Sequence, residues 1–206
     1  MPQLARDLLI PHRNYVAHNA NFDSGLTVFQ VLLDQGLRST DVLCDVGCGS
    51  LRVGRYLLTH LEHGHYYGIE PNKWLIDAAI DEEVGTLPRV KNWHIASGAS
   101  YSDFNIANAF PQALFDWVLI SSVLTHASHA QMRQALTNAM MVSSKVLFDT
   151  IPTGSGAPDN TDEWQYPQVA NHDDVCVLAA IEGLTTKLTK LHLGTFGEQW
   201  WRLDYA

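Results

Sequence analysis

The sequence predicts an α/β fold in which a mainly parallel sheet ends in an antiparallel hairpin. Short apolar runs alternate with longer segments of helical periodicity, which is typical of parallel strands covered by helices. The runs are almost continuously apolar, as expected for strands that are buried on both faces. Near the end of the chain, two β-like stretches are separated only by residues 194–197, which include two glycines. Such a short connection favours a hairpin.

Each element follows from this pattern. The expected strands are residues 42–46, 65–69, 92–96, 115–120, 145–149, 185–193 and 198–205. The expected helices are residues 24–35, 51–61, 73–80, 128–141 and 173–181. Pro71 precedes the third of these helices, and Gly36 and Gly183 follow the first and the last, in positions where helices often begin and end.

The composition indicates one globular domain. The chain has 206 residues, of which 46% are hydrophobic, and a formal net charge of −9. A chain this acidic has no electrostatic footprint for nucleic acid. Residues 1–10 lack the apolar core of a signal peptide, and no apolar stretch is long enough to span a membrane. With three cysteines in no disulfide-framework spacing, we expect a cytoplasmic protein without a membrane partner.

A glycine loop follows the first strand. Asp45, Gly47, Cys48 and Gly49 close this strand and lead into a helix, so backbone N–H groups there can approach a ligand. A tight strand-to-helix turn without a ligand would also need glycine. Two further features favour a nucleoside ligand.

Glu70 ends the next strand, where a carboxylate can accept hydrogen bonds from ribose hydroxyls. Position 52 is arginine, where a dinucleotide fingerprint would have its third glycine. The pattern therefore disfavours a pyrophosphate-containing cofactor such as NAD, and adenosylmethionine is the common alternative.

Three segments resemble the first, second and fourth motifs of class I S-adenosylmethionine-dependent methyltransferases, and they are most similar to small bacterial members. These segments are residues 42–49, 66–71 and 115–126, in the family's order and spacing. The resemblance implies a Rossmann-like, seven-stranded and mainly parallel sheet with a C-terminal antiparallel hairpin. It also implies one methyltransferase domain over residues 1–206, with cap helices in residues 1–38 and an acceptor-side loop in residues 151–172.

The resemblance also implies a set of cofactor-binding residues. Asp45 would orient the glycine loop or bind the amino group of the cofactor's methionine part, which Gly47 and Gly49 would approach. Glu70 would hold the ribose. The predicted cofactor site is completed by Cys48, Pro71, Asp103, Phe104 and Ser121. Position 51 is leucine, where the family pattern D-x-G-x-G-x-G has a third glycine.

Two histidines are candidate bases for removing a proton from the methyl acceptor. His126 follows the fourth strand, at the sheet edge where α/β proteins bind ligands. His12 lies in the N-terminal segment. A helix cap for His126, or a surface position for His12, would explain each without catalysis. Trp164, Tyr166 and His172 lie in the loop after the fifth strand and are candidate acceptor contacts, unless they only pack that loop onto the domain.

The predicted acceptor is a small molecule: a sugar, a natural product or a peptide intermediate. No Asn/Asp-Pro-Pro-Tyr sequence follows the fourth strand, where Ser121 and Ser122 stand instead, which disfavours nucleic-acid bases. The alternatives are a protein or peptide methyltransferase, a non-catalytic adenosylmethionine-binding protein and an NAD-dependent oxidoreductase. No cysteine and histidine spacing matches a standard metal site, so no metal is expected. The sequence does not predict an oligomeric state.

Overall fold

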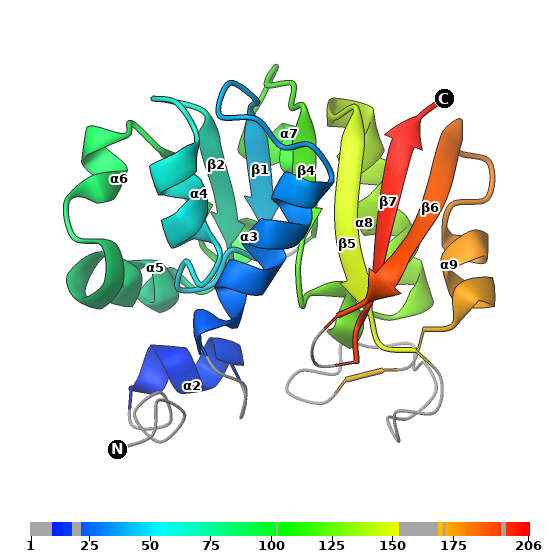
Figure 1. Ribbon diagram of the computed structural model, residues 1–206, viewed down its shortest axis with the longest axis horizontal. Coiled ribbons are helices and arrows are strands. Elements are labelled where there is room, and N and C mark those ends of the chain that lie inside the picture. The colour runs from blue at the N-terminus through cyan, green and yellow to red at the C-terminus, as the bar shows by residue number, and fades with distance from the viewer. Residues whose placement is uncertain (1–9, 18–21, 102, 153–168, 171, 195–196) are drawn as a thin grey trace. The chain divides into compact units, whose positions relative to one another are not determined.

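The computed structural model describes residues 10–17, 22–101, 103–152, 169–170, 172–194 and 197–206. The chain divides into two compact units, Met1–Ser102 and Asp103–Ala206. Each unit has its own strands with helices beside them (Figure 1).

Unit 1 contains a three-stranded parallel sheet in the order β3-β2-β1. Its strands are β1 (Leu43–Val46), β2 (Tyr66–Glu70) and β3 (His94–Ser97). Its α-helices are α2 (Pro11–Ala17), α3 (Gly25–Asp34), α4 (Gly54–His60), α5 (Lys73–Ala79) and α6 (Leu87–Val90). Short helical turns are η1 (Phe22–Ser24), η3 (Ala99–Tyr101) and the π-helical η2 (Ile80–Val84), which continues α5.

Two helices of unit 1 show how backbone geometry sets their ends. After α3, Gly36 adopts a φ of +97°, which confirms the predicted stop. The helix predicted from residue 51 begins only at Gly54, because Leu51 has a φ of +61° and so belongs to the preceding loop. Unit 1 also contains α2, which lies within residues 1–38, where the family resemblance implied cap helices but the hydrophobic pattern gave no bounds for it. In Figure 1 the arrowheads of β1 and β2 point toward the end of unit 1 where α2 lies.

Unit 2 contains four strands in the order β4-β5-β7-β6. They are β4 (Trp117–Ile120), β5 (Lys145–Thr150), β6 (Thr186–Leu193) and β7 (Gln199–Tyr205). Its helices are α7 (Ile106–Ala109), η4 (Leu124–His126), α8 (His129–Val142) and α9 (Asp174–Ala180). Strand β5 is parallel to β4 and antiparallel to β7, and β7 is antiparallel to β6.

Local sequence signals account for the helices of unit 2. Ser128 and Gln131 form a capping box at the start of α8, and the Asp173 side chain caps α9 by accepting from the Cys176 backbone N–H. All four residues of β4 are buried, as expected for a strand covered on both faces.

The predicted fold class is confirmed. Three strands in unit 1 and four in unit 2 give the expected seven, and the strand pairs within each unit are parallel except those of β7, which is antiparallel to both β5 and β6. Within the described ranges, no helix is long and apolar enough to cross a membrane. The same residues include no group of three or more His, Cys, Asp or Glu side chains that could hold a metal ion.

Candidate active site

The glycine loop of unit 1 is fixed by backbone hydrogen bonds to β2. The N–H groups of Gly47 and Cys48 both donate to the Ile69 carbonyl oxygen, at 2.8 and 3.0 Å. Gly47 and Gly49 have φ values of +73° and +56°, which glycine adopts without steric cost. Leu51 adopts +61° in the same loop, so a buried leucine keeps the left-handed conformation where the family pattern has glycine.

Glu70 joins this loop to the end of β2. Its Oε2 accepts from the Gly49 N–H at 3.0 Å, and its Oε1 accepts from the backbone N–H and side-chain amide of Asn72 at 2.8 and 2.9 Å. Burial raises the pKa of Glu70, and the hydrogen bonds from Asn72 and Gly49 oppose that rise. A carboxylate accepts about four hydrogen bonds, so Glu70 keeps capacity for a ligand hydroxyl.

Asp45 lies at the base of the loop with an exposed fraction of only 3%. Its pKa is raised to about 7, mainly by burial and also by the charge of Glu70, against the opposing effects of a hydrogen bond from Tyr66 and the charge of Arg52. Cys48 is also buried, and its Sγ packs over Gly68, where a Cβ would come within 3.0 Å. Cys48 therefore turns its thiol into the protein, which leaves its backbone as the group for a ligand.

Helix α2 covers the glycine loop within unit 1. The side chain of Val16 is so close to Gly49 that a Cβ on Gly49 would lie 2.9 Å from Val16 Cγ1. The Tyr15 ring meets Trp74 edge to face, with centroids 5.3 Å apart, and its hydroxyl accepts from Asn72 Nδ2 at 3.4 Å. These contacts place α2 beside Glu70 and its partner Asn72.

The predicted base His12 lies on α2, where it contacts Glu83 of η2. Its Nε2 is 2.8 Å from Glu83 Oε1, and its exposed fraction is 1%. Arg13 pairs with both oxygens of Glu83, with Nη2 to Oε2 at 2.9 Å. Glu83 belongs to the π-helical η2, a type of segment that is frequent at functional sites. This geometry favours a role for His12 in fastening α2, and its role as a base stays a prediction.

In unit 2, Ser121 and Ser122 directly follow β4. Ser121 is 8% exposed, and its buried hydroxyl has no hydrogen-bond partner among the residues described. Ser122 has a φ of +56°, and its N–H donates to Asp149 Oδ1 on β5 at 2.6 Å. The turn after β4 is thus fixed by a buried carboxylate.

The structure brings the predicted residues His126 and His172 to neighbouring segments. His126 ends η4 and is 7% exposed. The backbone N–H of Ala170 donates to Thr125 O at 2.8 Å, and His172 Nε2 donates to Ala127 O at 2.9 Å. A carbonyl oxygen can only accept, so His172 carries its proton on Nε2. Burial lowers the pKa of His172, which keeps the ring neutral at pH 7.

Asp103 and Phe104 lie against α8. Gln134 Nε2 donates to the Asp103 carbonyl oxygen at 3.1 Å, and Asn138 Nδ2 donates to the Phe104 carbonyl oxygen at 3.0 Å. The Phe104 backbone has a φ of +58° and the residue is 9% exposed, so the turn is tightly held. Their predicted role in binding the cofactor stays a prediction.

Two predicted acceptor contacts, Trp164 and Tyr166, lie outside the described residues. The geometry adds groups that the sequence analysis did not select: Tyr66, Asn72, Glu83 and Asp149. Asn72 directly follows the motif that contains Glu70 and Pro71, so its position could have been noticed. The other three act through contacts between distant parts of a unit, for which the sequence contains no local signal.

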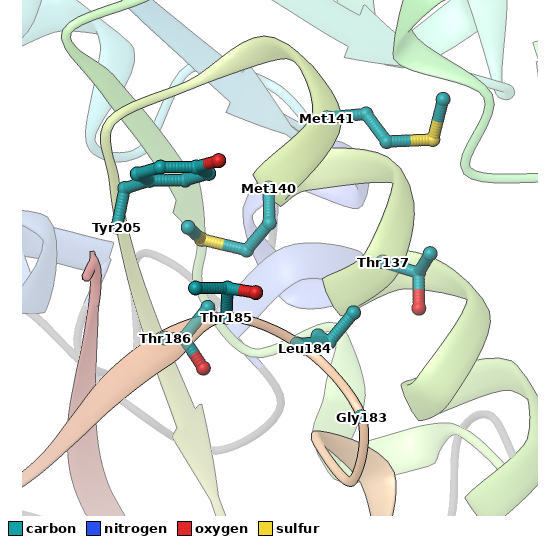
Figure 2. A pocket seen from close by; sticks show the side chains of 8 residues that line it. All are labelled: Thr137, Met140, Met141, Gly183, Leu184, Thr185, Thr186 and Tyr205. Carbon is teal, nitrogen blue, oxygen red and sulfur yellow. The ribbon is translucent and has the colours of Figure 1, made fainter.

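Unit 2 contains a cavity of about 350 Å³ (Figure 2). It is lined by Thr137, Met140, Met141, Gly183, Leu184, Thr185, Thr186 and Tyr205. The Tyr205 N–H donates to Ser144 O, directly before β5 begins, so the cavity is at the amino end of that strand. Ser121 and His126 follow the carboxyl end of β4, and β4 is parallel to β5. The cavity is therefore separate from Ser121 and His126 within unit 2.

The comparisons with known proteins agree with this geometry. Residues 44–143 match a family model described as a methyltransferase domain. No curated protein matches the chain in sequence. Solved structures match it in fold.

Three solved structures illustrate the fold match. One is magnesium protoporphyrin IX methyltransferase (ChlM) from Synechocystis PCC 6803 with bound SAM. It is 12% identical, with a TM-score of 0.63, and the match covers 100% of this chain and 85% of that one. DesVI from Streptomyces venezuelae is 12% identical, with a TM-score of 0.67 and coverage of 96% and 97%. A DhpI–SAH complex is 12% identical, with a TM-score of 0.65 and coverage of 99% and 95%.

These identities are low, so the solved structures establish the fold, and the family model adds the kind of domain. The glycine loop and Glu70 occupy the predicted positions within the matched segment. Residues 44–143, just under half of the chain, match a methyltransferase domain, and the solved structures that share the fold include complexes with SAM and SAH. These matches agree with the class I S-adenosylmethionine-dependent methyltransferase family, the enzyme class and the cofactor predicted from the sequence.

Proposed function

We propose that this enzyme methylates a small-molecule acceptor, with His126 as the base that removes the acceptor's proton. The observation that supports this most directly is the buried polar set after β4: Ser121, His126 and His172 are 8%, 7% and 1% exposed. Polar side chains this enclosed suit a compact acceptor that enters among them better than a flat macromolecular surface.

The groups at the glycine loop fit adenosylmethionine. Asp45 offers a buried carboxylate to the ammonium of the methionine part, and Glu70 offers remaining acceptor capacity to the ribose. Gly47 and Gly49, with φ values of +73° and +56°, present backbone without side chains. When bound, the cofactor supplies an activated methyl group on a sulfonium, so the protein's task is orientation and proton removal.

Helix α2 acts as a cap over the glycine loop. The contact of Val16 with Gly49 and the pairing of His12 and Arg13 with Glu83 support this role. In this proposal His12 fastens the cap. The rest of residues 1–38 is assigned to the cap by the family resemblance alone.

On the acceptor side, we assign different roles to the two histidines His126 and His172. His126 receives the proton of the acceptor hydroxyl or ammonium, since an imidazole suits proton transfer near neutral pH. His172 is neutral and uses Nε2–H on Ala127, so its Nδ1 has the lone pair for binding. We assign His172 to positioning the acceptor, together with the loop of residues 151–172.

The net negative charge of the chain also supports a small-molecule acceptor. The net charge of −9 disfavours nucleic acid, and one solved structure of the same fold is a methyltransferase of magnesium protoporphyrin IX. The three cysteines are free, which supports the proposed cytoplasmic location.

One experiment tests both halves of the proposal. Isothermal titration of the purified chain should give micromolar binding of S-adenosylhomocysteine and no binding of NAD. A screen of small metabolites with methyl-labelled cofactor should then show transfer of label to a low-molecular-weight product. Label that appears only in protein or peptide fractions would overturn the small-molecule assignment, and an absence of nucleoside binding would overturn the cofactor site.

A further inference from the structure

The Asp45 carboxylate is contacted by a phenol from the neighbouring strand. Tyr66 on β2 donates from Oη to Asp45 Oδ2 at 3.0 Å, and both residues are at most 3% exposed. The strand register places Asp45 opposite Gly68, two residues after Tyr66 and on the same face of β2. The phenol therefore reaches its partner along the strand, past a residue that has no side chain.

Two glycines make room for this hydroxyl. A Cβ on Gly54 of α4 would lie 2.6 Å from Tyr66 Oη, and a Cβ on Gly68 would lie 3.4 Å from it. Any side chain at position 54 would displace the hydroxyl or the helix, because a contact of that length is not tolerated. The hydrogen bond thus lies in a slot formed by α4, β1 and β2.

We propose that Tyr66 is a positioning residue for methyl transfer, whose hydroxyl fixes the Asp45 carboxylate for the ammonium group of the cofactor. This inference rests on the proposed function, in which Asp45 receives that ammonium. Tyr66 uses one lone pair of Oδ2, so Oδ1 retains its lone pairs for the ligand. The phenol replaces the water that an exposed carboxylate would use.

The charged and titratable groups around Asp45 make this contact important near neutral pH. The pKa of Asp45 is raised to about 7 in total: burial raises it most, Tyr66 and Arg52 lower it, and Glu70 raises it. Cys44, Cys48 and Tyr66 are themselves neutral there, because burial raises each of their pKa values well above the ordinary range. Loss of the Tyr66 hydroxyl would therefore favour protonation of Asp45, and a protonated carboxyl binds an ammonium poorly.

The test is the pH dependence of S-adenosylhomocysteine binding, measured by isothermal titration. Tyr66→Phe keeps the ring and removes only the hydroxyl. We expect about tenfold weaker binding at neutral pH and a midpoint of the affinity profile about one pH unit higher, since tenfold corresponds to one pKa unit. Asp45→Asn should bind S-adenosylhomocysteine weakly, and its affinity profile should lack this midpoint. Adding Tyr66→Phe to Asp45→Asn should cause no further loss of affinity.

Tyr67→Phe is the matched control. It removes the same hydroxyl from the next residue of β2, whose ring stacks on His94 with centroids 4.3 Å apart. Its affinity and midpoint should equal those of the wild type. If Tyr66→Phe fails to fold, 3-fluorotyrosine at position 66 keeps the contact with a more acidic phenol and should lower the midpoint.

The outcomes separate the two proposals. Wild-type protein that does not bind S-adenosylhomocysteine contradicts the proposed function. Wild-type protein that binds, with the same affinity profile in Tyr66→Phe or with fluorotyrosine, overturns only the role of Tyr66. Equal extra loss when Tyr66→Phe is added to Asp45→Asn would also overturn it, because the phenol would then act independently of the carboxylate.

Discussion

The polar groups that follow the strands differ between the two units. In unit 1 the carboxylates of Glu70 and Asp45 accept hydrogen bonds from Gly49, Asn72 and Tyr66. In unit 2, His172 is placed by bonds to backbone carbonyl oxygens, and the buried Ser121 hydroxyl has no partner within the described part of the chain.

This difference indicates how each unit meets its ligand. In the proposed function, a cofactor with fixed charges would meet carboxylates that the fold has already oriented, so little rearrangement would be needed. Polar atoms without an internal partner are costly when buried, which makes Ser121 a group that a ligand can satisfy. Under this proposal the carboxylates of unit 1 are oriented before the cofactor binds, whereas unit 2 keeps hydrogen-bonding capacity for the acceptor.

The largest effect is expected for His126→Ala. Loss of the general base should lower kcat by about 10²–10⁴-fold, while the affinity for S-adenosylhomocysteine stays unchanged. Label transfer to the acceptor gives kcat, and titration gives the affinity. His63→Ala, an exposed histidine of unit 1, is the control and should keep full activity. Full activity in His126→Ala would remove it as the base and leave unit 2 with a binding role.

The second largest effect is expected for Gly49→Ala, which tests whether ligand binding depends on the backbone conformation of the glycine loop in unit 1. The new Cβ would lie 2.9 Å from Val16 Cγ1, at a φ of +56°. We expect roughly 100-fold weaker binding of S-adenosylhomocysteine, because strain of about 1–3 kcal/mol and displacement of α2 add together. Gly36→Ala has a similar φ, +97°, but open space around it. That control should lose stability in thermal unfolding yet bind normally; equal binding loss in both variants would refute the local explanation.

A pH effect on stability should follow from Asp45. Its pKa is about 7 in the folded protein, above the ordinary value of 3.8. Folding favours the protonated form of Asp45. The stability that Asp45 contributes is therefore complete below about pH 4 and is lost as the pH rises through about 7. Between about pH 5 and about pH 8, the free energy of unfolding in urea should fall by roughly 2 kcal/mol more in the wild type than in Asp45→Asn.

Equal slopes in the two proteins would show that Asp45 is ionised throughout that range. Glu70 should leave a smaller slope of the same sign in Asp45→Asn, because burial raises its pKa as well. Bound S-adenosylhomocysteine should reduce the slope in the wild type, since an ammonium favours the carboxylate form.

The smallest effect concerns Ser121. Ser121→Ala removes a buried hydroxyl that has no partner among the described residues, so the free energy of unfolding should stay equal or rise by up to about 1 kcal/mol. The control Ser128→Ala removes the N-cap of α8 and should cost about 1 kcal/mol. Ser121→Ala should also weaken ligand binding several-fold in titration. A stability loss equal to that of Ser128→Ala would show that Ser121 has a structural role.

The sequence by itself determined the order of the elements and the position of the glycine loop. That Gly47, Gly49 and Glu70 lie close together could be predicted because a loop, its strand and the following strand are close in sequence and obey short-range rules. The end of α3 at Gly36 and the cap of α8 at Ser128 followed for the same reason.

Only the tertiary structure decided which side chains meet. Tyr66 contacts Asp45 across two strands, and Glu83 contacts Arg13 over a separation of 70 residues. Leu51 adopts the left-handed conformation expected of glycine because the buried loop around it imposes that path. Such contacts depend on how distant segments pack, and local sequence patterns do not encode packing between distant segments.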